Sequence, residues 1–336
     1  MISLAILIVA VTACSGGSSP GGGGSGGTGL ESALSRVADT ASNRSQVTYD
    51  DTAALVRLAG TNPASTKGFA GLRGSGVPSV AENFYTVPGG VGFDLFGEDY
   101  SISAGEPPQS VSLMAGGQSA SQITSHLTGL GWKRSGGAGK LAGPPLAAGS
   151  SAGELAIGAA QVQPTGSDVV FGYSGANLSL IGSPKGATLA SDPIIGALAQ
   201  CLGNVVAADL FSGGYLGGQM PAGLGVGISQ PASNSATPHA VVCVSWSTQA
   251  AATTYAADVR RALSSVDLVE DEPYSDFLTH ATVTTVGGSQ HVVEWQADTP
   301  KSAQTAFLMV NDISLPALPD CQKLTALQAA RVIGCR

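Results

Sequence analysis

Short segments of alternating apolar and polar residues recur along the chain, and several are followed by a segment with apolar residues three or four positions apart. The first spacing is typical of half-buried strands and the second of amphipathic helices. A strand–turn–strand–helix unit is therefore predicted three times. The units comprise strands at 100–103 and 110–115 with a helix at 119–130, strands at 223–228 and 240–246 with a helix at 248–263, and strands at 281–286 and 290–296 with a helix at 302–312.

Further elements are predicted outside these units. Leu30, Leu34 and Val37 would share one face of a helix over 30–41, a strand follows at 46–49, and a helix capped by Asp50 or Asp51 runs through residue 58. A strand is predicted at 168–174, and Asp192-Pro193 would begin a helix that continues to about residue 210.

Hairpins that alternate with helices indicate an α+β fold, with antiparallel or mixed sheets and helices packed on one face. The recurrence of the unit predicts two similar halves, at 29–186 and 187–336, with a soft boundary in the Pro/Gly-rich region 182–190. A tightly packed single domain is the alternative.

Composition narrows the possible functions. Hydrophobic residues make up 43% of the 336 residues and charged residues only 11%, and the formal net charge is −8. That charge argues against a nucleic-acid partner, because such proteins need a basic surface. The high Ala, Gly and Val content is similar to that of secreted actinobacterial proteins.

The first residues favour export. Met1–Ala13 is almost wholly apolar, too short to span a bilayer, and typical of a signal peptide. The tetrapeptide Val11-Thr12-Ala13-Cys14 resembles the lipobox of bacterial lipoproteins. That resemblance implies a signal peptide at 1–13 and a lipid on Cys14; a conventional secretory signal with an unmodified cysteine is the alternative.

A Gly/Ser-rich segment at 14–28 follows the signal and predicts a flexible tether, with a root-mean-square span of about 20 Å. A two-chain lipid anchors a protein stably in a membrane. The expected location is therefore the outer face of the cytoplasmic membrane, with the membrane itself as one partner.

Without Cys14, four cysteines remain, an even number that suits an oxidising compartment. They allow three pairings. We favour Cys201–Cys243 and Cys321–Cys335, because both bridges then close locally in the sequence.

Candidate catalytic and metal-binding residues are sparse. Gly149-Ser150-Ser151-Ala152-Gly153 matches the serine-hydrolase elbow, but a loop rather than a strand is predicted before it. The four histidines lie in no metal-binding or catalytic spacing, and no cofactor motif is present.

The sequence thus favours a non-enzymatic binding or accessory module whose partner is another envelope protein or an envelope glycan. A solute-binding lipoprotein of a transporter and a hydrolase that uses Ser151 are the alternatives.

Overall fold

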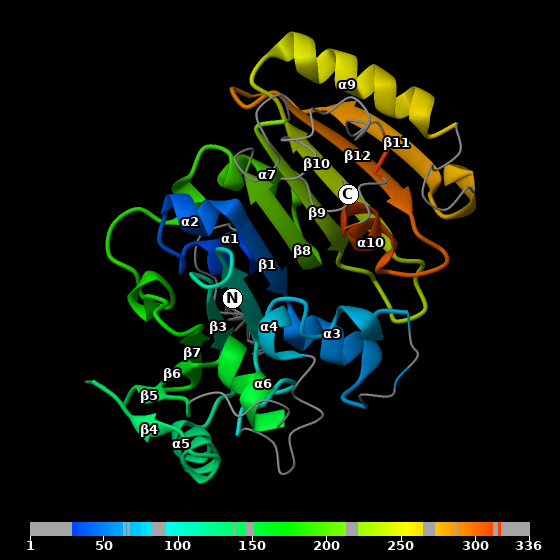
Figure 1. Ribbon diagram of the computed structural model, residues 1–336. Helices are drawn as coiled ribbons and strands as arrows, with labels where there is room; N and C mark the ends of the chain where they lie inside the picture. Colours follow the sequence, from blue (N-terminus) through cyan, green and yellow to red (C-terminus); the bar gives the residue numbers. More distant parts are fainter. Residues whose placement is uncertain are drawn as a thin grey trace, which may run out of the picture.

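A computed structural model describes residues 29–62, 65, 68–81, 92–136, 139–144, 151–212, 221–264, 273–286, 288–311 and 315–316, with the side chains of 151–154 outside the described part. Its centre is a 12-stranded sheet in which all neighbouring strands are antiparallel (Figure 1). In sheet order the strands are β11 (Thr279–Thr285), β12 (Val292–Asp298), β10 (His239–Ser245), β9 (Gly223–Ser229), β8 (Val205–Ser212), β1 (Gln46–Asp50), β2 (Tyr100–Ala104), β3 (Val111–Ala115), β7 (Asp168–Gly172), β6 (Gln161–Thr165), β5 (Leu141–Ala142) and β4 (Lys133–Arg134).

The α+β class is confirmed. The α-helices are α1 (Gly29–Leu34), α2 (Ala41–Ser45), α3 (Thr52–Ala59), α4 (Pro78–Ala81), α5 (Ala120–Gly129), α6 (Ser151–Gly158), α7 (Ile195–Leu202), α9 (Gln249–Ala262) and α10 (Thr305–Asn311). Short 3₁₀ helices are η1 (Ala70–Leu72), η2 (Leu178–Leu180), η3 (Leu189–Ser191) and η4 (Tyr274–Asp276).

Five consecutive sheet positions in each half of the chain follow the same order, and β5 and β4 extend the sheet beyond those of the first half. In the first half these are β1, β2, β3, β7 and β6, and in the second half β8, β9, β10, β12 and β11. A helix follows the third strand in both, α5 after β3 and α9 after β10. The halves meet where β1 pairs with β8, so that one sheet runs through both of them (Figure 1).

Helices pack on both faces of the sheet, and the prediction of a single covered face is wrong. Along β10, Val242 joins an apolar cluster with α3, α9 and α10, whereas the adjacent Val241 joins a cluster with α1 and α7. Successive strand residues point to opposite faces. The central strands are therefore apolar on both sides, a pattern that does not reveal how many faces the helices cover.

Two predicted helices are present but end earlier than predicted. The one at 30–41 ends at Leu34, and Val37 and Ala38 form isolated bridges instead. The one at 192–210 ends at Leu202, where Gly203 adopts a positive φ of 66°, and β8 begins at Val205. A fully buried central strand lacks polar alternation, which explains the confusion with a helix.

The other predicted helix starts are confirmed where a side chain caps the first turn. Asp51, Ser119 and Thr248 each accept a hydrogen bond from a backbone N–H at the start of α3, α5 and α9. The third unit is present as β11, β12 and α10, although the turn residue Gly287 lies outside the described part. Among the described residues, no helix has the length and apolar character needed to cross a bilayer.

Candidate binding sites

A stripe of polar side chains crosses the middle of one sheet face. Cross-strand pairing aligns Asp50 of β1 with Ser101 of β2, and Thr48 with Ser103. Ser112 of β3 is paired with Ser103, and we call these five residues the polar stripe; Asp209 of β8, paired with Thr48, continues it on the other side. The stripe separates the apolar cluster beneath α9 from a third cluster around α4, α5 and α6. It is buried, so each polar atom in it needs a partner within the protein.

Two buried carboxyl groups share one hydroxyl at the end of this stripe. Thr52 Oγ1 lies 2.5 Å from Asp50 Oδ1 and 2.9 Å from Glu98 Oε1. A hydroxyl has a single proton to donate, so one of the two carboxyl groups must itself carry a proton and donate it to Thr52. The backbone N–H of Gly76 donates to Asp50 Oδ2 at 2.9 Å, whereas Glu98 Oε2 is buried without a partner in the described part of the chain.

The electrostatics indicate that Glu98 holds that proton. Burial, and then the proximity of Asp50, raises the pKa of Glu98 well above its ordinary value. Burial also raises the pKa of Asp50, to about 6, although the hydrogen bonds from Thr52 and Gly76 oppose the rise. The Asp50–Glu98 pair therefore carries a buried proton in the folded protein. No cavity that we describe reaches it, so we assign it no ligand.

A pocket of about 290 Å³ opens over the other end of the polar stripe. Thr48 and Ser103 form part of its lining, and both donate to the carbonyl oxygen of Gly76. Its remaining lining residues are Gln46, Pro78, Ser79, Gly105, Pro107, Ser110 and Tyr173. We call this cavity the hydroxyl pocket, because hydroxyl groups dominate it and none of the described residues that line it is charged.

Several polar groups of the hydroxyl pocket are available to a ligand. The side chains of Gln46, Ser79, Ser110 and Tyr173 form no hydrogen bond within the described part of the chain. Burial raises the pKa of Tyr173, which keeps its hydroxyl protonated and able to donate. Pro78 and Pro107 add small apolar surfaces. The pocket can therefore accept and donate hydrogen bonds to an uncharged polar ligand.

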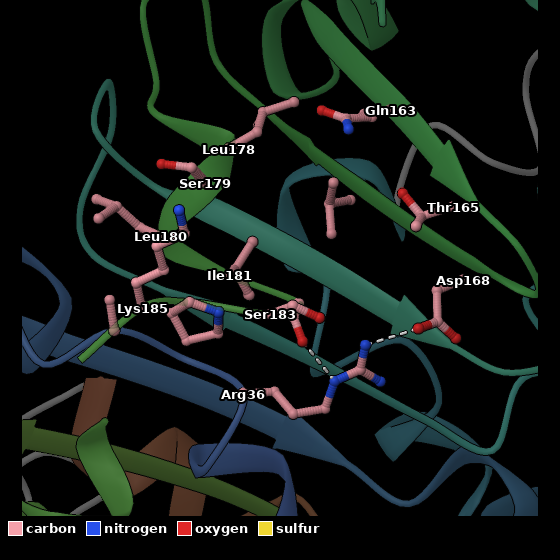
Figure 2. A pocket seen from close by; sticks show the side chains of 14 residues that line it. Arg36, Gln163, Thr165, Asp168, Leu178, Ser179, Leu180, Ile181, Ser183 and Lys185 are labelled. Carbon is pink, nitrogen blue, oxygen red and sulfur yellow. Dashed lines mark hydrogen bonds and ion pairs between the residues drawn. The ribbon is translucent and has the colours of Figure 1, made fainter. Parts of the chain in front are cut away.

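A larger cavity of about 520 Å³ lies on the opposite face, beside β6 and β7. Its lining includes Arg36, Asp168 and Lys185, and we call it the Arg36 groove. Figure 2 shows Leu180 and Lys185 on one side of this groove and Asp168 on the other, with Arg36 between them.

A further polar cluster lies at the β10, β11 and β12 edge. His239 Nδ1 and His280 Nδ1 each lie 2.8 Å from an oxygen of Asp298. Burial opposes protonation of His239, but its hydrogen bonds with Asp298 and Gln296 raise its pKa overall. Those same imidazoles lower the pKa of Asp298. The carboxylate thus holds two strand ends together through charge-assisted bonds.

The structure tests some of the predicted site residues. Cys201 of α7 and Cys243 of β10 form the predicted disulfide. Cys14, Cys321 and Cys335 lie outside the described residues. Ser151 is the first residue of α6 and its side chain is not described, so the hydrolase alternative remains a prediction.

Sequence reasoning missed the polar stripe, the hydroxyl pocket, the Arg36 groove and the Asp298 cluster. Regular alternation in QVTYD and SIS is consistent with a strand whose second face is polar, and that signal could have suggested the polar stripe. Glu98 and Arg36 lie outside the strands, and nothing in the local pattern indicates their partners. Comparison of the chain with known protein families, with curated proteins and with solved structures finds no match.

Proposed function

We propose that the protein is a lipid-anchored, non-catalytic binding module on the outer face of the cytoplasmic membrane, and that it binds an uncharged unit of an envelope glycan in the hydroxyl pocket. The observation that carries this proposal is the pocket lining, whose described residues combine hydroxyl and amide groups that are unpaired within the described part of the chain with no charged side chain. Sugars offer the matching set of donors and acceptors. A charged ligand would find no counter-ion there to offset its desolvation.

The environment of the pocket supports the same choice. Asp209 of β8 is paired with Thr48, and Asp50 lies two residues beyond Thr48 on the same sheet face, so the ionisable groups that flank the pocket along these strands are carboxyl groups and would disfavour an anion. The volume is close to the lower limit of about 300 Å³ for typical ligand pockets. Both features favour a single neutral sugar ring over a polyanion or a large cofactor.

The alternative of a two-lobed solute-binding lipoprotein receives less support. Such proteins have parallel sheets and a hinge, whereas the described strands form one antiparallel sheet.

A titration with neutral sugars tests the glycan proposal. The full-length chain in detergent would be titrated with arabinose, galactose, mannose and N-acetylglucosamine, with binding followed by saturation-transfer NMR. We expect at least one sugar to bind, and the double variant Ser110→Ala/Tyr173→Phe to bind it about tenfold more weakly, because two hydrogen bonds of about 0.5–1.5 kcal/mol each are lost. Ser183→Ala, a hydroxyl removed at the Arg36 groove, is the matched control. Binding of none of these sugars, or equal binding by the double variant, would refute the assignment.

Metabolic labelling tests the anchor separately. Cells that express the chain would be fed an alkyne-tagged fatty acid, which we expect to label the wild type and not Cys14→Ser. Equal labelling of both proteins, or of neither, would contradict lipidation at Cys14.

A further inference from the structure

We propose that the Arg36 groove is a second binding site, which takes an anionic membrane lipid with its head group on Arg36 and Lys185 and an acyl chain along the apolar wall. This inference goes beyond the glycan proposal and concerns the opposite face of the sheet. It rests on the fixed arginine, the charge of the groove, its apolar wall and its place in the chain.

Arg36 is held in position with donors to spare. Its Nε donates to the carbonyl oxygen of Gly182 at 2.9 Å, one terminal nitrogen to the Tyr100 hydroxyl at 3.3 Å, and the other to Asp168 Oδ2 at 2.6 Å. Asp168 is itself fixed, because its other oxygen accepts the backbone N–H of Gly116 at 2.9 Å. A guanidinium has five N–H groups, so two remain for a ligand. The side chain is 28% exposed, which leaves it accessible from the groove.

The charge of the groove favours an anion. Its charged lining residues are Arg36, Lys185 and Asp168, which together carry one net positive charge in a chain of net charge −8. Lys185 is exposed and has no ion-pair partner in the described part of the chain. Phosphate and carboxylate groups are the anions that a fixed guanidinium binds best.

The wall opposite Asp168 favours an alkyl chain. Val170 of β7 and Leu178, Leu180 and Ile181 in and after η2 line the groove beside the cations. Val170, Leu178 and Ile181 are each at most 6% exposed and Leu180 is partly buried, so the apolar surface that the groove offers is small. An amphiphile would cover it and gain about 25 cal/mol for each Å² buried, a gain that a free inorganic anion would not have. Gln163, Thr165 and Ser183 also line the groove and can bind the polar part of a head group.

The position of the groove in the chain favours a lipid from the membrane. α1 begins at Gly29, directly after the predicted tether, and Arg36 follows the end of α1 by two residues. A helix rises about 1.5 Å per residue, so α1 places Arg36 within roughly 10–15 Å of the tether. The choice of a membrane lipid as the source rests on the proposed anchor; the preference for an anionic amphiphile does not.

Photo-crosslinking in a bilayer tests the proposal. The full-length chain would be reconstituted in phosphatidylcholine nanodiscs that contain a small fraction of phosphatidylglycerol with a diazirine in its acyl chain, and the crosslinked peptides would be identified by mass spectrometry. We expect crosslinks within residues 163–185, and a yield about fivefold lower in Lys185→Gln, because one cation near the head group is lost. Lys133→Gln, which removes an exposed lysine on β4 outside the groove, should keep the full yield. A thermal melt would show that both variants are folded.

Each part of the lipid proposal has an outcome that would overturn it. Equal crosslinking by diazirine-labelled phosphatidylcholine would overturn the charge argument. Displacement of the lipid by millimolar glycerol 3-phosphate would identify a free phosphate ester as the ligand and would overturn the proposal that the ligand is a membrane lipid. Absence of crosslinks in 163–185 would overturn the site itself. Sugar binding by Lys185→Gln should be unchanged, so failure of this proposal and failure of the glycan proposal are separate results.

Discussion

Replacement of Asp50 by asparagine should make the protein more stable at neutral pH and should remove part of the dependence of its stability on pH. Asp50 is completely buried, and burial raises its pKa from an ordinary 3.8 to about 6. The difference of about 2.2 pH units, at about 1.36 kcal/mol each, means that ionised Asp50 costs the folded state about 3 kcal/mol.

The direction of the effect follows from the raised pKa. The neutral carboxyl is favoured in the folded state, so its stabilising contribution is present below about pH 4 and is lost as the pH rises through 6. The asparagine side chain would keep the acceptor for the Gly76 N–H and could donate to Thr52 Oγ1, whose proton would then be free for Glu98. We therefore expect Asp50→Asn to unfold at higher urea concentration than the wild type at pH 8, with a gain of up to about 3 kcal/mol, and to show no such gain at pH 4.

Urea denaturation of both proteins between pH 4 and pH 8 measures this difference. Other groups also titrate in this range, so the quantity to compare is the free energy of unfolding of the wild type minus that of the variant at each pH. Glu106→Gln, at an exposed residue, is the control for removal of one negative charge and should not reproduce the gain in stability of Asp50→Asn. If Asp50→Asn were equally destabilised at all pH values, the carboxyl would act only as a hydrogen-bond acceptor and the reasoning from burial would be refuted.

Three further predictions concern other parts of the fold. Removal of the disulfide in Cys201→Ser/Cys243→Ser should lower the free energy of unfolding by about 4 kcal/mol for the 42-residue separation, measured by urea denaturation without reductant. In Asp298→Asn the pKa of His239 should fall, because its charged partner is lost; an unchanged NMR titration of the His239 ring would contradict the pairing. Gly76→Ala should lower the melting temperature sharply, since its Cβ would lie 2.3 Å from Ser101 Oγ and 2.4 Å from the Ser101 carbonyl oxygen, and a thermal melt like that of the wild type would contradict this packing.

Much of the local structure could be predicted because its causes are local. Asp51 and Thr248 cap their helices by contacts three residues away, and short strand-like segments bounded by turn residues identify most strands of the sheet. The Cys201–Cys243 pairing could be chosen because it closes a short loop. Where a segment is apolar on every side, as in β8, the pattern does not separate strand from helix, and the prediction of a long helix was wrong.

The sites depended on tertiary structure. Arg36 forms an ion pair with Asp168, which lies 132 residues away in the sequence, and Thr52 is hydrogen-bonded to Glu98, 46 residues away. Alternation along a strand shows that Thr48 and Asp50 share a face, but not that Ser101 and Ser103 lie opposite them.

The sequence by itself therefore determined most of the elements and one covalent link, since each depends on residues close together in the chain or on the pairing of few cysteines. Only the tertiary structure decided which polar residues meet, which cations face a cavity and which carboxyl group must keep its proton. Those properties depend on register and burial, and both follow from the pairing of strands that are distant in the chain.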